Sequence, residues 1–471
     1  MTTQCTQESF RFHALNGRQV RGGFDGGTIS SDGGGLLLRE VEKRAKIIEQ
    51  FAGCFQDHRQ PERIEHTVRE LVAQRVYGLA LGYEDLNDHD QLREDPLLAV
   101  LAEKEDPTGK SRVRQRDTGK ALAGKSTLNR LELTAAAVAE KERYKKIVLD
   151  PEAADRLLVN VLLQAHETAP DQIVLDVDAT DDPLHGQQEG RFFHGYYGHY
   201  CYLPLYIFCG EFLLCARLRP SNIDAAAGSV EELERIVTQI RAAWPEVKIV
   251  VRGDSGFCRE ELMSWCRAHR VEYLFGLAQN ERLRQEIASE AEQAKRQFAA
   301  TGQAARVFRD FHYQTRKSWS QARRVVGKAE HLEKGSNPRF VVTSLAAEEW
   351  PAQRLYEELY CARGEMENRI KEQLMLFADR TSTALLRSNQ VRLYFSSAAY
   401  ALLQALRRLG LKGTGMASAQ CATLRLKLLK IGALIRITVR NVWVSLSSSY
   451  PFAALFRHVL SQLQHTGPLR C

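Results

Sequence analysis

The chain has 471 residues, which is long enough for two or three domains with a sizeable hydrophobic core. Its hydrophobic content of 44% and charged content of 26% are those of a globular protein, and no segment has the features of a secretory signal or a membrane-spanning helix. Ten scattered cysteines without a CxxC pair predict free thiols in a reducing cytoplasm, and the net charge of +7 is gathered at the C-terminal end. We therefore expect a cytoplasmic protein with no membrane partner.

The first 165 residues are predicted to form a mainly helical N-terminal region. Apolar residues recur at helical spacing in four segments, separated by turns rich in Gly and Asp: residues 35–51, 64–81, 97–101 and 127–146.

Residues 166–380 change to a mixture of strands and helices. The expected order is strand, strand, strand, helix, strand, helix, strand, over residues 172–178, 202–209, 212–218, 225–243, 247–252, 259–269 and 271–276. A three-stranded meander followed by two right-handed crossovers predicts an α/β fold: a ribonuclease-H-like mixed sheet with flanking helices. A charged helix and strand-like pieces, whose pairing is left open, form an insertion at about 279–347, and a long helix resumes over about 350–377.

Acidic residues stand at the ends of two of the predicted strands. Asp176 and Asp178 share one face of the first strand because side chains alternate along a strand. Asp254 follows the strand VKIVVR directly, and residues beyond strand ends converge in sheets of this kind. Carboxylates on neighbouring strands can share Mg²⁺ or Mn²⁺, which prefer oxygen ligands. The alternative is that each Asp caps the turn that follows it.

A third acidic candidate lies on the long helix, in the segment YCARGEMENRIKEQ. At 100° per residue, Tyr360, Arg363, Glu367 and Lys371 fall on one stripe of the helix. Glu365 and Glu372 lie well round the helix from that stripe, so helical phase singles out Glu367, flanked by two cations that could grip phosphates. The same spacing would also suit an ordinary surface salt-bridge ladder.

Residues 381–471 form a basic C-terminal region that contains no Asp or Glu and twelve Lys or Arg residues. The rest of the chain therefore carries −5 of the net charge of +7. A basic region of this kind indicates a polyanionic partner, DNA or RNA, and its alternative is a helical tail that is incidentally basic. Arg425, Lys427 and Lys430 are its candidate phosphate-binding residues.

Several motifs together resemble the bacterial insertion-sequence transposases of the DDE type, specifically the family numbered thirteen-eighty. They are LDVDATDDPLHGQQEG (175–190), GYYGHYCYLPLYIF (195–208), LRPSN (218–222), VRGDSGF (251–257), YCARGEMENRIKE (360–372), GGLLLRE (34–40) and STLNRLE (126–132). The resemblance implies that Asp178, Asp254 and Glu367 are the catalytic metal ligands. It places Tyr360 and Arg363 in a Tyr-x-x-Arg-x-x-x-Glu signature.

Two positions depart from the family pattern or leave it ambiguous. In a broader related group a Lys follows the Glu after six residues, but that position is Leu374 here, so Lys371 is the nearest substitute. Asp176 shares the face of Asp178 and could share or take its role as a metal ligand.

The resemblance also implies an activity, a cofactor and partners. Two Mg²⁺ ions, for which Mn²⁺ may substitute, would support cutting at the ends of an insertion sequence and joining of the 3′-hydroxyl ends to target DNA. The implied partners are double-stranded DNA, as terminal inverted repeats and target, and a second copy of the chain in a homodimer, in a bacterial cytoplasm at the nucleoid. The 1–165 region would then bind DNA, and the 381–471 region would contact DNA or dimerise.

Alternatives remain open for the function and for one tryptophan. The chain could be a metal-dependent nuclease without strand transfer, or a chemically inert DNA-binding protein descended from a transposase. Related transposases with a strand-rich insertion use a hairpin intermediate, and Trp319 in the 279–347 insertion could stack on a flipped base, although ordinary packing is favoured.

Residues 119–126, GKALAGKS, match the pattern of a phosphate-binding P-loop in full. A P-loop follows a buried apolar strand, whereas the preceding segment here is SRVRQRDT. We therefore expect no nucleotide cofactor, and expect the stretch to contact DNA phosphates or to begin a helix at Ser126.

Overall fold

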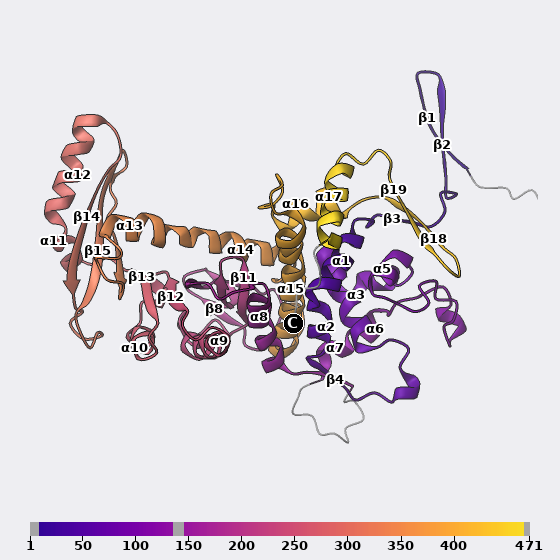
Figure 1. The fold of residues 1–471 in the computed structure, drawn as a ribbon, viewed down its shortest axis with the longest axis horizontal. Helices are drawn as coiled ribbons and strands as arrows, with labels where there is room; N and C mark the ends of the chain where they lie inside the picture. The colour runs from indigo at the N-terminus through magenta and orange to yellow at the C-terminus, as the bar shows by residue number, and fades with distance from the viewer. Residues whose placement is uncertain (1–8, 135–145, 466–471) are drawn as a thin grey trace, which may run out of the picture.

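A mixed sheet forms one half of the protein, whose computed structural model describes residues 9–134 and 146–465 (Figure 1). Its five core strands are β6 (Gln172–Ala179), β10 (Leu205–Cys209), β11 (Phe212–Arg217), β12 (Lys248–Gly253) and β13 (Glu272–Leu277). They lie in the order β11-β10-β6-β12-β13, with β6, β12 and β13 parallel and β10 and β11 antiparallel to their neighbours. This is the order of a three-stranded meander followed by two crossovers, so the predicted ribonuclease-H-like fold class is confirmed.

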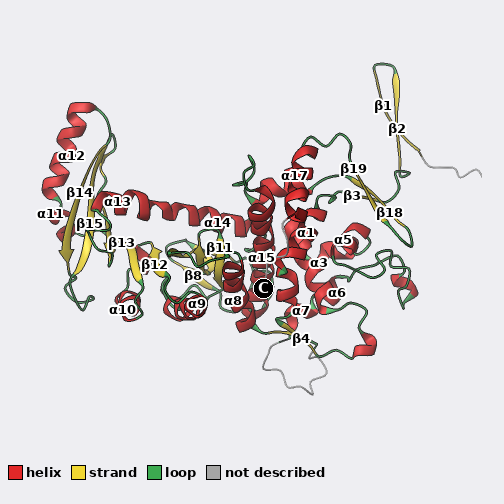
Figure 2. Ribbon diagram, viewed as in Figure 1, coloured by secondary structure: helices red, strands yellow, loops and turns green. Residues whose placement is uncertain are grey.

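The two faces of this sheet are covered by different helices. Leu175 and Val177 of β6 face a core that includes residues of α8 (Pro151–Gln164), α9 (Ser229–Ala243) and α10 (Glu260–Ala268). On the other face Val250 of β12 and Leu274 of β13 pack beneath the helix that begins at Ala352. Figure 2 shows these helices on opposite sides of the yellow strands. The alternation of side chains along β6 therefore turns Asp176 and Asp178 away from the first core.

The 279–347 insertion extends the same sheet. Its strands are β14 (Ala305–Tyr313), β15 (Arg323–Leu332), the two-residue β16 (Gly335–Ser336) and β17 (Arg339–Thr343), with α11 (Glu281–Glu286) and α12 (Ala288–Thr301) beside them. β17 pairs antiparallel with β13, and β15 and β14 follow it outward. The pairing that the sequence left open is thus a continuation of the same sheet, not a separate module.

The other half of the protein is mainly helical and is built from both ends of the chain. The central helix α15 (Leu386–Leu406) packs against α1 (Gly35–Ala45), α2 (Ile47–Ala52) and α3 (Val68–Leu81). One hydrophobic cluster includes Leu37, Val76, Leu402 and Val459, the last from α17 (Ala453–His465). The regions 1–165 and 381–471, which were predicted separately, therefore share one hydrophobic core.

Short elements complete this helical half. They are β3 (Ile29–Ser30), β4 (Phe55–Asp57), α4 (His89–Leu92), α5 (Pro96–Leu101), α6 (Lys125–Leu128), α7 (Arg130–Leu133), β5 (Ile147–Leu149), α16 (Cys421–Leu424), β18 (Ala433–Ile437) and β19 (Val442–Leu446). Strand β18 pairs with β3 as well as with β19, which again joins the two ends of the chain. Among the described helices, none is long and apolar enough to cross a membrane.

One feature of the N-terminal region was not anticipated, and one expectation was wrong. Strands β1 (Ser9–Leu15) and β2 (Arg18–Gly23) form a hairpin that projects from the body in Figure 1. Asn16 and Gly17 both have positive φ in its turn, and this Asn-Gly pair was a hairpin signal in the sequence. The helix expected over 127–146 ends at Leu133 instead, and residues 135–145 of that expectation lie outside the described residues.

The helix expected over about 350–377 is continuous but irregular, and it ends earlier. It consists of α13 (Ala352–Arg354), a π-helical turn (Leu355–Tyr360), a 3₁₀ turn (Cys361–Arg363) and α14 (Gly364–Leu374). Such π-helical turns inside helices occur frequently at functional sites.

Glu372 of α14 anchors this helix to the helical half. Its carboxylate is fully buried and accepts hydrogen bonds from Arg407 at 2.5 Å, Arg369 at 2.7 Å and the backbone N–H of Cys421 at 2.8 Å. Arg407 is itself 1% exposed at the side chain, so the pair is shielded from water. A buried carboxylate with this many donors is a structural residue, which separates Glu372 from Glu367.

We predict that Glu372→Ala destabilises the fold by about 3–5 kcal/mol, because it removes the closer of the two carboxylate partners of the buried Arg407. The free energy of unfolding from urea denaturation measures the effect. Glu358→Ala is the matched control, since Glu358 pairs with Arg354 on the exposed side of the same helix and should cost no more than about 0.5 kcal/mol. Equal losses for the two variants would contradict the structural role of Glu372.

Candidate active site

The parallel register of β6 and β12 brings two of the predicted acidic residues together. Arg252 lies opposite Asp176 and Gly253 opposite Val177. One step further along the same register places Asp254 beside Asp178, at the carboxyl end of the two strands. The pairing of the two strands thus brings Asp178 and Asp254 to the same edge of the sheet, as expected from their positions at the strand ends.

Asp254 occupies a tight turn that begins directly after β12. Its Oδ1 accepts a hydrogen bond from the backbone N–H of Gly256 at 2.8 Å and caps the 3₁₀ turn Ser255–Phe257. On the adjacent strand, a Cβ added at Gly276 would lie 2.6 Å from the Tyr360 hydroxyl and 3.2 Å from the Asp254 carbonyl carbon. Gly276 therefore permits the signature tyrosine and the acidic turn to approach the sheet closely. The sequence analysis did not single out Gly276.

Arg363 connects the first acidic residue with the third. Its guanidinium lies 3.2 Å from Asp178 Oδ2 and 3.4 Å from Glu367 Oε1. The Glu367 contact confirms the i, i+4 spacing expected from helical phase, whereas the contact to Asp178 joins the helix to the end of β6. The Glu367 side chain is 53% exposed and the Asp178 side chain 16% exposed, so the group opens to solvent on the helix side. Lys371 is exposed and makes no ion pair within the described residues.

Burial raises the pKa of Asp178 to about 6. Removal from water is the largest cause, and the carboxylates of Asp254 and Glu367 add to it, while Arg363 works in the opposite direction. Asp178 therefore lies within electrostatic range of the other two carboxylates and of the Arg363 guanidinium. A local excess of negative charge of this kind is what a bound cation would relieve.

Asp176 has a different set of partners from Asp178. Arg252 donates to both of its oxygens, from Nε to Oδ1 at 2.5 Å and from Nη2 to Oδ2 at 2.7 Å, and both side chains are 7% exposed. The remaining Arg252 nitrogen, Nη1, donates to the backbone carbonyl of Leu359 on the helix above. Arg252 is a linking residue of the site that the sequence analysis missed, and an arginine inside a buried apolar strand was its signal, because a buried charge requires a partner.

The other candidate residues lie away from the acidic group. Trp319 is 6% exposed and packs edge-to-face against Tyr313, which is the packing arrangement favoured from the sequence. Arg425 donates to the carbonyls of Leu79, Ala80 and Met375. Lys430 pairs with Asp32 at 2.6 Å, and Lys427 is exposed with its ammonium 5.9 Å from the ring centre of Phe452. Two of these three basic residues are thus engaged inside the fold.

The acidic group has the right donors for Mg²⁺ but is not assembled as a ligand set. Across residues 9–134 and 146–465, no three His, Cys, Asp or Glu side chains lie close enough to hold an ion together. Asp178, Asp254 and Glu367 nevertheless supply carboxylate oxygens, and the charges of Asp254 and Glu367 add to the effect of burial in raising the pKa of Asp178. Carboxylate oxygens are the type of ligand that Mg²⁺ prefers, so the residues suit such a cation. In this structure the Arg363 guanidinium lies between Asp178 and Glu367.

Comparisons with known proteins show the family to which the chain belongs. The sequence profile of the family described as Transposase DDE domain group 1 matches residues 12–468, and the chain therefore belongs to that family of transposases. No curated protein sequence matched the chain. Among solved structures, a piggyBac transposase synaptic complex with hairpin DNA is similar at 10% identity and a TM-score of 0.40, over 85% of this chain and 80% of that one. We draw no functional conclusion from a structural similarity of that size.

We predict that Asp178→Asn stabilises the metal-free protein by about 1–3 kcal/mol near pH 7.5. The folded-state pKa of about 6 lies above the ordinary 3.8, so the folded protein binds this proton more tightly and loses stability as the pH rises from about 4 to about 6. Asparagine has no charge to desolvate, and its advantage should shrink toward pH 4. Urea denaturation in EDTA at several pH values measures the difference in unfolding free energy between the variant and the wild type. A stabilisation that does not change with pH would contradict its assignment to the buried charge of Asp178.

Asp176→Ala is predicted to have the opposite effect on stability. It leaves Arg252 buried without a counter-charge, which should cost about 3–5 kcal/mol of unfolding free energy. The same denaturation series provides the measurement. Stabilisation by Asp176→Ala, or no change, would show that the Arg252 pair is not a structural link.

Proposed function

We propose that the chain is an active DNA transposase that cuts at the ends of an insertion sequence and joins the freed 3′-hydroxyl ends to target DNA. Its catalytic residues are Asp178, Asp254 and Glu367. The observation that carries the proposal is the register of β6 and β12, which sets Asp178 and Asp254 side by side, with Glu367 linked to them through Arg363. Membership of the DDE-domain family and the motif resemblance to the insertion-sequence family numbered thirteen-eighty support it.

Two Mg²⁺ ions, when bound, would supply an activated attacking oxygen and stabilise the leaving oxygen of an in-line phosphoryl transfer. Asp178 and Asp254 would hold them from the strand ends, and Glu367 from the helix. Asp178 must be ionised to act as a ligand, so its raised pKa should weaken cation binding as the pH falls below about 6. Asp176 stays outside this set because both of its oxygens are bound to Arg252.

Arg363 has a second task in this proposal. In the structure it neutralises Asp178 and Glu367, so the site does not present three unpaired carboxylates to a polyanion. Once cations occupy the carboxylates, its guanidinium is available for a phosphate oxygen of the DNA, to which it can donate two hydrogen bonds. Tyr360 fixes the approach of this part of the helix to Gly276, and exposed Lys371 lies one turn beyond Glu367.

The partners follow from the reaction. Double-stranded DNA is bound as terminal repeats and as target, and two chains form a homodimer when two element ends are held together. The strand-rich insertion at 279–347 lies at the edge of the catalytic sheet, where it could support a hairpin intermediate.

We predict that Asp178→Ala, Asp254→Ala and Glu367→Gln each lower DNA cleavage by at least about 10³-fold, since each removes a group that positions the reacting phosphate. The assay uses a supercoiled plasmid that carries the DNA flanking the reading frame, with Mg²⁺, and DNA binding is measured in parallel. Glu365→Gln, on the same helix, is the matched control and should cleave normally.

The same plasmid assay separates the alternatives. Nicked plasmid without inserted products would show a nuclease without strand transfer. Binding without cleavage in either Mg²⁺ or Mn²⁺ by the wild-type chain would show an inert DNA-binding protein. Normal cleavage by any one of the three variants would remove that residue from the site.

We also predict that Mg²⁺ raises the melting temperature of the wild-type protein at pH 7.5, because an ion that binds only the folded state stabilises it by mass action. The shift should be lost in Asp178→Asn and should diminish as the pH falls below about 6, where Asp178 takes up a proton. Equal shifts for the wild type and the variant would place the metal elsewhere.

A further inference from the structure

A basic pocket lies in the helical half of the protein, beside α6 and α7, and these helices stand on the opposite side of α15 from the strands β12 and β13 in Figure 1. It has a volume of about 540 Å³ and is formed by the segment after β4, by the loop before α6, and by the start of α7. Three residues of the GKALAGKS segment line it: Lys120, Gly124 and Ser126. Lys125, the residue a P-loop would turn toward phosphates, instead bonds Asn87 at 3.0 Å and Asp90 at 3.4 Å.

Positive charge dominates the lining of this basic pocket. Eight Arg or Lys residues face three Asp or Glu residues. The acidic residues are already engaged: Glu65 pairs with Arg112 at 3.2 Å, and Asp117 pairs with Arg93 at 3.5 Å. His66 is buried, its ring lies 2.5 Å from Arg112, and burial together with nearby cations lowers the pKa of His66 to about 3. The pocket therefore holds a net positive charge that no residue of its own lining offsets.

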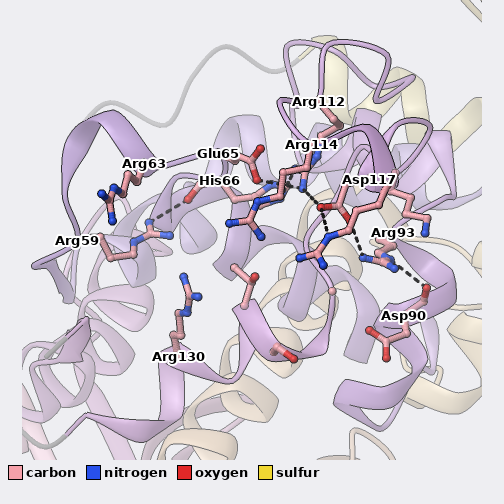
Figure 3. A pocket seen from close by; sticks show the side chains of 15 residues that line it. Arg59, Arg63, Glu65, His66, Asp90, Arg93, Arg112, Arg114, Asp117 and Arg130 are labelled. Carbon is pink, nitrogen blue, oxygen red and sulfur yellow. Dashed lines mark hydrogen bonds and ion pairs between the residues drawn. The ribbon is translucent and has the colours of Figure 1, made fainter. Parts of the chain in front are cut away.

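Three of the arginines have no side-chain partner among the described residues. Within the described residues, the side chains of Arg63, Arg114 and Arg130 make no hydrogen bond or ion pair, and all three residues are exposed. In Figure 3 Arg114 extends down from the upper loop and Arg130 extends up from α7 toward the same space. Like charges held around one cavity repel each other, so the arrangement favours an anion between them.

The lining also indicates the size of the anion. Pockets for small organic molecules are mostly apolar with a few polar groups, whereas nearly every residue here is charged or polar. The cations come from three separate segments that surround an open cavity. This spread suits a ligand with several phosphate groups better than a ligand with one phosphate group. Arginine side chains are the usual contacts to the phosphate backbone of nucleic acids.

We propose that this basic pocket binds the phosphate backbone of double-stranded DNA, with Arg63, Arg114 and Arg130 as its contacts. The inference rests on the proposed function in taking DNA as the substrate, and it assigns to the N-terminal region a binding surface separate from the acidic site. The GKALAGKS segment then serves as part of a wall of this surface and not as a nucleotide loop.

The test measures how DNA affinity depends on salt. Fluorescence anisotropy with a 40-base-pair duplex of random sequence, in EDTA, gives the dissociation constant between 50 and 200 mM NaCl. The variant replaces Arg63, Arg114 and Arg130 together with Gln, and is expected to flatten the slope of log K against log salt by about 2–3, at about 0.9 for each phosphate that the protein no longer neutralises. A second variant with Lys at all three positions should retain the slope.

A matched control removes the same charge elsewhere. Lys295, Arg296 and Lys334 are exposed in the 279–347 insertion and make no ion pair within the described chain, and their replacement with Gln should leave the slope unchanged. Equal flattening by the control would overturn the proposal, because net charge alone would then explain it. An unchanged slope in the Arg63, Arg114 and Arg130 variant, or a wild-type chain that binds no DNA, would also overturn it.

A final arm distinguishes DNA from a small phosphate. Melting temperatures are compared with 10 mM pyrophosphate and with NaCl of equal ionic strength. A pyrophosphate shift that the Gln variant lacks, with equal DNA slopes for both proteins, would replace DNA by a small phosphate ligand. Because binding is measured in EDTA, loss of the slope in a chain that does not cleave would support the pocket while refuting the transposase activity.

Discussion

Arg252 connects the three elements that carry the acidic residues. It pairs with Asp176 on β6 through two hydrogen bonds, stands on β12 two residues before Asp254, and donates to the Leu359 carbonyl on the helix that leads to Glu367. Because a buried guanidinium is costly unless all its partners are in place, the two strands and the helix are held in one arrangement. The position of Asp178 relative to Glu367 depends on that arrangement more than on any contact between the two carboxylates.

The acidic residues of this region illustrate how surroundings assign roles to similar side chains. Asp176 and Glu372 are buried with several donors each, and both act as anchors between elements. Asp178 and Glu367 share Arg363, and the Glu367 side chain is exposed to solvent. A carboxylate whose hydrogen bonds are complete inside the protein has no oxygen left for a cation, whereas a solvent-exposed carboxylate such as that of Glu367 can exchange its arginine for one.

The sharing of one core by the two ends of the chain changes where DNA contacts are expected. The C-terminal region contains no acid, but several of its cations serve the fold: Arg425 bonds the last carbonyls of α3, Lys430 pairs with Asp32, and Arg407 pairs with Glu372. Removal of residues 381–471 would take away α15 from the centre of that core. An excess of positive charge in a sequence segment therefore does not show where DNA binds. The arginines of the basic pocket that lack partners among the described residues indicate the DNA-binding surface better.

The sequence by itself determined the order of the catalytic strands and helices, the shared face of Asp176 and Asp178, and the phase that separates Glu367 from Glu365 and Glu372. These features depend on periodicities of two and 3.6 residues, which are local properties of the chain. Local signals also existed for what was missed, such as the Asn16–Gly17 turn of the β1–β2 hairpin.

Only the tertiary structure decided which of Asp176 and Asp178 pairs with Arg252, how the insertion strands pair, and which cations of the described residues lack partners. Each of these depends on residues far apart in the sequence: Asp176 on Arg252, β13 on β17, and Arg425 on the end of α3. Contacts of that kind have no periodicity along the chain, because they are fixed by how the elements pack and by the need of every buried charge for a partner.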